Sequence, residues 1–135
     1  MFRNFCYKFL NNKRTGYLGE LIVFFYLKLN GYLILDKNFK GKYGEIDLIA
    51  FKDKKLIIIE VKTRRIFNKI YPATYSINLK KQENIVKCTK EYLKKESINL
   101  RKLKIKKIEN DAICVYLVNN GNFLPKIIWY KSYFL

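Results

Sequence analysis

Residues 43–65, YGEIDLIAFKDKKLIIIEVKTRR, constrain the fold more than any other part of the chain. The apolar run 56–59 has the length and composition of a buried strand, and residues 44–51 have those of a strand that precedes it. The polar segment 52–55 between them predicts a short turn. The stretch therefore predicts a β-hairpin whose second strand is buried.

Charged residues occur in this hairpin where a folded core would exclude them. Side chains alternate between the two faces of a strand, so Glu45 and Asp47 are expected to share one face, and Glu60 and Lys62 to share one face. If the two strands pair, three carboxylates and one ammonium group converge at one end of a sheet. A buried carboxylate must be paired or bound to a metal, and the apolar run before Glu60 indicates that its strand is buried.

The chain has 135 residues, half of them hydrophobic, which predicts one domain over residues 1–135 with a real core. Its 28 Lys and Arg outnumber 11 Asp and Glu, giving a formal net charge of +17. Such an excess favours a polyanionic partner, nucleic acid above all. A genome rich in A and T supplies lysine codons whatever the function, and this alternative explanation of the charge stays open.

The chain contains no histidine, which excludes a Ser-His-Asp triad, a Cys-His dyad and any His-ligated zinc site. A metal would therefore be held mainly by oxygen, which indicates Mg²⁺ or Mn²⁺. Cys6, Cys88 and Cys114 match no metal spacing or disulfide framework, so reduced thiols are expected. The longest apolar run near the N-terminus, residues 21–27, is too short for a membrane span. These features predict a soluble, cytoplasmic protein without membrane contact.

The remaining elements follow from periodicity and turn residues, and they give the order α-β-β-β-α-β-β. We expect the following segments: an arm or short helix at 1–13, a helix at 15–30 capped by Thr15 and stopped at Gly31, a strand at 32–36 with a polar connection at 37–43, a helix at 76–95 capped by Ser76, a strand at 110–118, and an edge strand or extended tail at 123–134 after the turn signal 119–121.

The first helix is apolar nearly all round, so it is expected to be heavily buried. Glu20 is its only acid, and it has two interpretations. A negative charge near a helix N-terminus is stabilised by the helix dipole, which would be a structural role. The other interpretation makes Glu20 a member of the acidic site on the hairpin.

Residues 80–107 contain eleven Lys and Arg against three Glu. This surface is either a solvated face or a surface that follows phosphates, and the sequence leaves both open. Arg64 and Arg65 leave the Glu60 strand and are expected near the acids. The predicted nucleic-acid-binding residues are Arg64, Arg65, Lys80, Lys81 and Lys87.

Carboxylates from adjacent strands provide the hard oxygen ligands that suit Mg²⁺, and a bound metal assists phosphodiester hydrolysis. Asp47 and Glu60 fit the ligand role, with Glu20 or Glu45 completing the shell, and Lys62 fits a role on the attacking water or the phosphate. The structural alternatives are a strand-end salt bridge for Glu60 and Lys62, and a sheet-edge charge for Glu45.

These motifs resemble the YraN family, also known as UPF0102. The residues that carry the resemblance are Gly19-Glu20, Gly31-Tyr32, Asn38, residues 44–50 and 60–64, Lys81-Gln82 and Asp111. That family is similar to the PD-(D/E)XK nuclease superfamily, and to archaeal Holliday-junction resolvases in particular. The resemblance implies a restriction-endonuclease-like three-layer α/β fold with a mixed central sheet flanked by helices. It also implies Asp47, Glu60 and Lys62 as the catalytic core, with Glu20 as the helix acid.

Three functional hypotheses follow. The first is a Mg²⁺-dependent (or Mn²⁺-dependent) endonuclease that hydrolyses DNA, including branched or damaged DNA, with a homodimer as an option. The second is a non-catalytic nucleic-acid-binding module on a nuclease-like fold. The third is an assembly protein that uses residues 127–135 as an interface.

Overall fold

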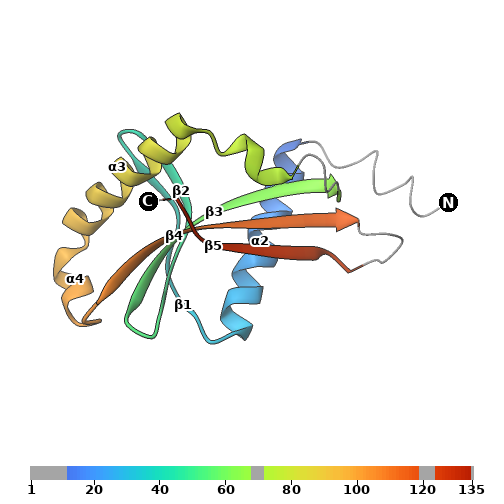
Figure 1. Ribbon diagram of the computed structural model, residues 1–135. Coiled ribbons are helices and arrows are strands. Elements are labelled where there is room, and N and C mark those ends of the chain that lie inside the picture. Colours follow the sequence, from blue (N-terminus) through green and yellow to red (C-terminus); the bar gives the residue numbers. More distant parts are fainter. Residues whose placement is uncertain (1–11, 68–71, 119–123, 135) are drawn as a thin grey trace.

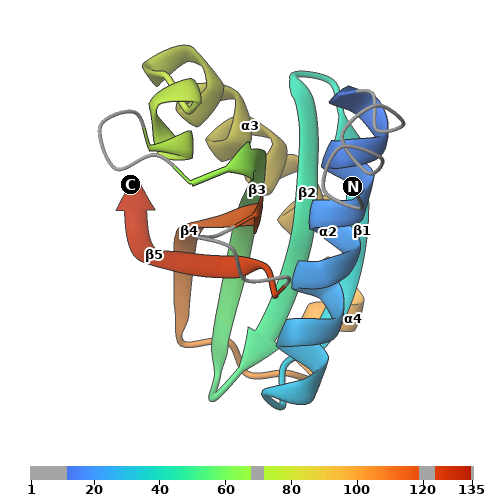
Figure 2. The same cartoon turned by 90° about the vertical axis from the view of Figure 1, so that its right-hand side faces the viewer.

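The computed structural model describes residues 12–67, 72–118 and 124–134 of the chain (Figure 1). It is a three-layer α/β fold in which a five-stranded mixed sheet separates α2 from α3 (Figures 1 and 2). The predicted fold class and element order are confirmed. The strands, in their order across the sheet, are β1 (Leu33–Gly41), β2 (Gly44–Lys52), β3 (Lys55–Ile66), β4 (Lys107–Val118) and β5 (Lys126–Phe134).

The hairpin at the centre of the sequence argument is formed by β2 and β3, which pair antiparallel. Its turn consists of Asp53 and Lys54 alone, both with left-handed φ angles of 50° and 62°. This handedness matches the twist of the flanking strands. Residues 56–59 are buried as expected, because β3 lies in the middle of the sheet with helices on both faces.

The second half of the sheet is built by a crossover. β4 lies parallel to β3, and α3 (Leu79–Lys95) connects the two over one face. β5 then pairs antiparallel with β4 and forms an edge of the sheet, as Pro125 predicted. The parallel pairing therefore places the N-terminal ends of β3 and β4 side by side, at the end of the sheet that carries Lys55 and Lys107.

Each face of the sheet has its own apolar cluster. Val23 and Leu27 of α2 (Asn12–Leu29) pack with Leu48, Ile59 and other residues on one face. Ile85, Cys88 and Tyr92 of α3 pack with Ile46, Ile58 and others on the opposite face. These two clusters fix both helices on the sheet, and with them the side chains that the helices direct toward its centre.

The first strand is longer than the sequence indicated. Residues 37–43 were expected to be a polar connection, but this expectation was wrong because Lys37 to Gly41 pair with β2. Only Lys42 and Tyr43 form the turn. Polar side chains are tolerated along this segment because β1 is an edge strand.

Both helix starts also differ from expectation. α2 begins at Asn12, so Thr15 lies inside the helix and is not its N-cap, whereas Gly31 with φ of 80° follows its end as predicted. α3 begins at Leu79, and the side chain of Asn78 caps it by accepting a hydrogen bond from the Lys81 N–H. The predicted cap Ser76 instead ends the 3-10 helix η1 (Ala73–Ser76).

The burial predicted for α2 holds only for the side that faces the sheet. Phe25 and Leu29 are 55% and 87% exposed, so its outer face carries apolar residues in solvent. A short helix that was not expected, α4 (Ser97–Arg101), follows α3.

Three predictions made from composition have different outcomes. Cys88 and Cys114 are free buried thiols, as predicted. Cys6 and nearly all of the expected N-terminal arm lie outside the described residues. No helix in the described part of the chain is long and apolar enough to cross a membrane.

Candidate active site

β2 and β3 separate at the candidate acids. The last paired residues are Leu48 and Ile59, and the same register would next bring Asp47 opposite Glu60. Instead, the N–H of Val61 donates a hydrogen bond of 2.8 Å to Oδ2 of Asp47. The Asp47 carboxylate thus replaces a backbone partner at the point where the hairpin opens.

The alternation of side chains is interrupted at the same place. Ile46 packs in the cluster beneath α3, whereas Leu48 packs in the cluster beneath α2, although the two are only two residues apart. Across the β1–β2 register from Asp47 lies Asn38, which has a left-handed φ of 52°. This local change in backbone direction places Asp47 between the two faces of the sheet.

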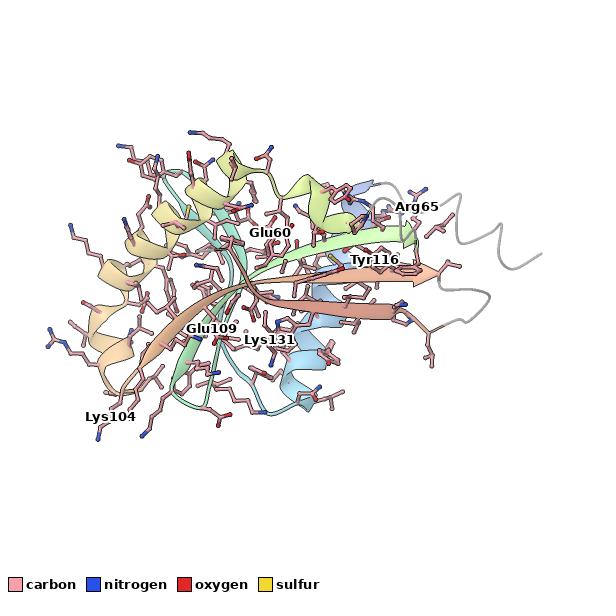
Figure 3. The ribbon with its side chains drawn as sticks, in the orientation of Figure 1. Glu60, Arg65, Lys104, Glu109, Tyr116 and Lys131 are labelled. Atoms are coloured by element: carbon pink, nitrogen blue, oxygen red, sulfur yellow. The ribbon has the colours of Figure 1, made fainter. Side chains whose placement is uncertain are left out.

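Glu60 lies on the α3 side and is only 3% exposed (Figure 3). Its Oε1 accepts from the Lys62 ammonium at 2.8 Å and lies 3.3 Å from the Lys81 ammonium of α3. Its Oε2 is buried and has no hydrogen-bond partner among the described residues. A buried oxygen of this kind costs free energy unless something else binds it.

Glu20 and Glu45 form a second acidic pair, bridged by an amide. With its nitrogen facing the carboxylates, the Asn38 amide donates to Glu45 Oε1 at 2.9 Å and to Glu20 Oε2 at 3.1 Å. Burial raises the pKa of Glu20, and the charges of Glu45 and Glu60 raise it further. The pKa of Glu20 therefore responds to the charges of both Glu45 and Glu60, although Glu20 reaches the site from α2.

Asp47 is the most strongly perturbed acid of the site. Burial, followed by the charge of Glu60, raises the pKa of Asp47 from its ordinary 3.8 to about 8, against the lowering effect of the Val61 hydrogen bond. The cause is that two carboxylates share a desolvated position. Perturbed acids of this kind are typical of functional sites.

A cleft of about 590 Å³ opens beside these acids, between the first turns of α2 and the last residues of β3. The helix and strand approach closely at its base, because a Cβ atom on Gly19 would lie 1.7 Å from Thr63 Oγ1. Both predicted arginines line it. The lining residues are Thr15, Gly16, Glu20, Val61, Lys62, Thr63, Arg64 and Arg65.

The predicted site residues are brought together only in part. Asp47, Glu60 and Lys62 meet at the hairpin opening, and Glu20 and Glu45 share the amide of Asn38. In residues 12–67, 72–118 and 124–134, no group of three or more His, Cys, Asp or Glu side chains is close enough to hold a metal ion. Among the other acids, Glu60 is the one whose charge raises the pKa of Asp47 most.

The three lysines predicted to bind nucleic acid have different surroundings. Lys80 is exposed, and its ammonium lies 3.9 Å from Glu83. Lys87 is exposed over the ring of Tyr43, at 5.0 Å from its centroid. Lys81 instead faces the acids through its contact with Glu60.

Sequence reasoning missed two contributors, the ion pair of Lys81 with Glu60 and the bridging amide of Asn38. Lys81 was predicted to bind nucleic acid and carries part of the family resemblance, but no local signal in its lysine-rich run indicated a contact with Glu60. Asn38 is one of the residue types that tolerate a left-handed φ angle, so a polar residue of this type inside a strand was the available signal.

Comparison with known proteins gives consistent matches. A family model described as "Uncharacterised protein family UPF0102" matches residues 19–115, a range that contains all the acids of the site. A UPF0102 protein of Dictyoglomus thermophilum is 39% identical over 115 residues, covering 85% of this chain and 92% of the relative. One of Clostridium botulinum strain 657 is 47% identical over 90 residues, covering 65% of this chain and 71% of the relative.

Proposed function

From the premise that this chain belongs to the UPF0102 family, we propose that it is a metal-dependent nuclease that hydrolyses phosphodiester bonds of DNA. One observation carries the proposal. Asp47 and Glu60 lie together at the opening of a buried hairpin, with a partnerless oxygen on Glu60 and the Lys62 ammonium 2.8 Å from its other oxygen. The three-layer α/β fold is consistent with the resemblance to PD-(D/E)XK nucleases.

The residues present fit a divalent cation of the Mg²⁺ type. Mg²⁺ is usually held by one or two carboxylates together with waters and substrate phosphates, so the pair Asp47 and Glu60 is a sufficient protein contribution. Glu60 Oε2 is a buried acceptor without a partner among the described residues, and the raised pKa of Asp47 means that its ionised form lacks compensating positive charge, which a bound cation would supply. A metal bound there would polarise the scissile phosphate and lower the pKa of a bound water.

Lys62 is proposed to act on the phosphate or on the attacking water. Its side chain is 22% exposed and lines the cleft, so its ammonium lies between the buried Glu60 and solvent. Ion pairing with Glu60 fixes the direction of this flexible side chain. Glu60 thus has a second role as the positioning residue of Lys62.

Arg64 and Arg65 are proposed to hold the phosphates that flank the cleavage point. Both line the cleft immediately after Lys62, and Arg64 is exposed. A guanidinium group suits this role because its fork of donors can bind two phosphate oxygens at once. Glu20 stands at the edge of the same cleft and is proposed to orient water or metal from the α2 side.

A non-catalytic nucleic-acid-binding module is the second candidate, and one observation favours it. Lys62 and Lys81 both contact Oε1 of Glu60, so two ammonium groups already compensate one carboxylate. In that case the acids hold β3 against α3, and the basic surface alone binds nucleic acid. A homodimer stays a prediction under both functions.

A cleavage panel separates the two functions. Duplex, single-stranded and four-way-junction DNAs, and matched RNAs, are incubated with Mg²⁺ or Mn²⁺ and with wild type, Asp47→Ala or Lys62→Ala. Nuclease function predicts metal-dependent cleavage by wild type and a loss of at least about a hundredfold in each variant, as expected when a group acting directly on the reaction is removed. Activity that survives both substitutions contradicts the proposal, and binding without cleavage of any substrate favours the second function.

A further inference from the structure

A group of exposed cations lies at the end of the molecule opposite the Arg65 end of β3 (Figure 3). They come from the β2–β3 turn, the last residue of α4 and the connection between α4 and β4, and we call them the distal basic patch: Lys54, Arg101, Lys102, Lys104 and Lys106. Backbone hydrogen bonds join the two segments, because the N–H groups of Lys106 and Lys107 both donate to the carbonyl of Lys54, at 2.8 and 3.4 Å. The patch is therefore one surface.

These cations lack partners of their own. Within the described ranges, none of the five side chains makes an ion pair. The buried acid at this end, Glu109, is already compensated by Lys107 at 2.9 Å and Lys55 at 3.4 Å. Apart from the exposed Asp53 in the turn, the positive charge of the patch faces solvent.

The backbone does not explain why lysine occurs here. Lys54 and Lys104 have left-handed φ angles of 62° and 51°. Most side chains other than Asn and Asp disfavour this conformation, by roughly 1–2 kcal/mol relative to the right-handed one. Codons rich in A and T encode asparagine as readily as lysine, and asparagine would suit both turns better. Base composition therefore does not account for cations at these two positions.

The patch has a fixed spatial relation to the candidate active site. Along β3, Lys55 at the patch lies five residues from Glu60, which corresponds to about 17 Å. On the surface, α3 runs from Lys81 at the site toward α4 at the patch (Figures 1 and 3). Lys87 and Lys94 are exposed along this helix. Exposed lysines therefore lie on the helix that runs from the acids toward the distal basic patch, with Glu83 exposed among them.

We propose that the distal basic patch binds the sugar–phosphate backbone of a double-stranded DNA arm, about five base-pair steps of 3.4 Å from the candidate active site. The inference takes its partner class from the proposed function but does not depend on catalysis. A duplex suits the geometry because its phosphates keep fixed spacings, as the patch and the acids do on one sheet. A single strand would lose conformational freedom to bind both places.

Binding measured in EDTA, without cleavage, tests this inference. The probe is a duplex of about 24 base pairs, roughly 80 Å long, titrated between about 50 and 200 mM salt. The patch variant is Lys102→Gln with Lys106→Gln. The matched control is Lys28→Gln with Lys131→Gln, two exposed lysines on α2 and β5 that lie over the rings of Phe24 and Trp129.

Loss of two phosphate contacts is expected to lower the salt slope by about 2 and to weaken duplex binding at least tenfold at about 100 mM salt, with little change in the control. Lys104→Asn separates charge from folding, because it is expected to weaken duplex binding while keeping or raising the melting temperature.

Equal affinities of patch and control variants would overturn the inference. So would a patch variant that keeps duplex binding but loses binding to vesicles containing anionic lipid, since the patch would then contact a membrane surface. If the cleavage panel fails but patch-dependent duplex binding is found, only the proposed catalysis is contradicted.

Discussion

Replacing Asp47 by Asn is expected to stabilise the metal-free protein, and increasingly so as the pH rises. Asparagine has nearly the same shape and can still accept the hydrogen bond from the Val61 N–H. It cannot ionise, however, so it avoids placing a second negative charge beside Glu60. The substitution therefore removes a cost that wild type carries in its folded state.

The raised pKa of Asp47 determines the direction in which folding stability changes with pH. The pKa of Asp47 rises from 3.8 in the unfolded chain to about 8 in the fold. Between these values the folded state holds a proton that the unfolded state has released, so the contribution of Asp47 to wild-type stability is fully present at low pH and is lost as pH rises toward 8. The slope is about 1.4 kcal/mol per pH unit, or about 3 kcal/mol between about pH 5 and 7.

Urea denaturation at a series of pH values measures this difference directly. The free energy of unfolding of Asp47→Asn minus that of wild type is expected to grow by about 3 kcal/mol from about pH 5 to 7 in EDTA. Asp53→Asn, at the exposed turn of the same hairpin, is the matched Asp-to-Asn control. Parallel profiles for wild type and Asp47→Asn would refute the reasoning, because the carboxyl group would then not be held protonated by burial and Glu60.

Three further substitutions test the packing around the site. Gly19→Ala is expected to cost about 1–3 kcal/mol, because its Cβ would lie 1.7 Å from Thr63 Oγ1; thermal melts should show partial recovery when Thr63→Ala is added. Tyr116→Phe leaves the buried N–H of Ala73 without its acceptor and is expected to cost about 1–3 kcal/mol in urea denaturation; an unchanged midpoint would contradict this role. Asp111→Asn removes one of the two carboxylate oxygens that accept hydrogen bonds from the Trp129 indole and the Ser132 N–H of β5, so it should lower stability by about 2 kcal/mol. Metal binding should stay intact, as calorimetry in the presence of Mn²⁺ would report.

The hairpin could be predicted from sequence because its signals are local. An apolar run at 56–59, a polar turn and alternating residues before it determine two strands and their pairing. The strand at 37–41 was missed because polar residues on an edge strand do not alternate with apolar ones. Its pairing depends on β2, which is a tertiary property.

The candidate site was predictable as a set of residues but not as an arrangement. Alternation along ideal strands places the acids together, whereas the backbone change at Asn38 and Asp47 divides them between the two faces of the sheet. Glu60 and Lys62 meet as expected. The contact of Lys81 with Glu60 depends on how α3 crosses the sheet, and a single sequence carries no signal for that packing.

On the outer face of α2, the sequence predicted more burial than the structure has. An apolar composition predicted burial all round the helix, yet only the side toward the sheet has a partner, and Phe25 and Leu29 are exposed. Composition reports which side chains avoid water. It does not report how many layers are present to cover them.

Binding of Mn²⁺ to the hairpin acids tests the central claim most directly, because it needs no substrate. Electron paramagnetic resonance titration of free Mn²⁺ compares wild type with Asp47→Asn, Glu60→Gln and the exposed control Asp53→Asn. The account predicts a site in wild type and in the control, and at least about tenfold weaker binding in each of the other two variants, as expected when a ligand is removed. Equal binding by all four proteins would contradict the claim that Asp47 and Glu60 together hold a divalent metal.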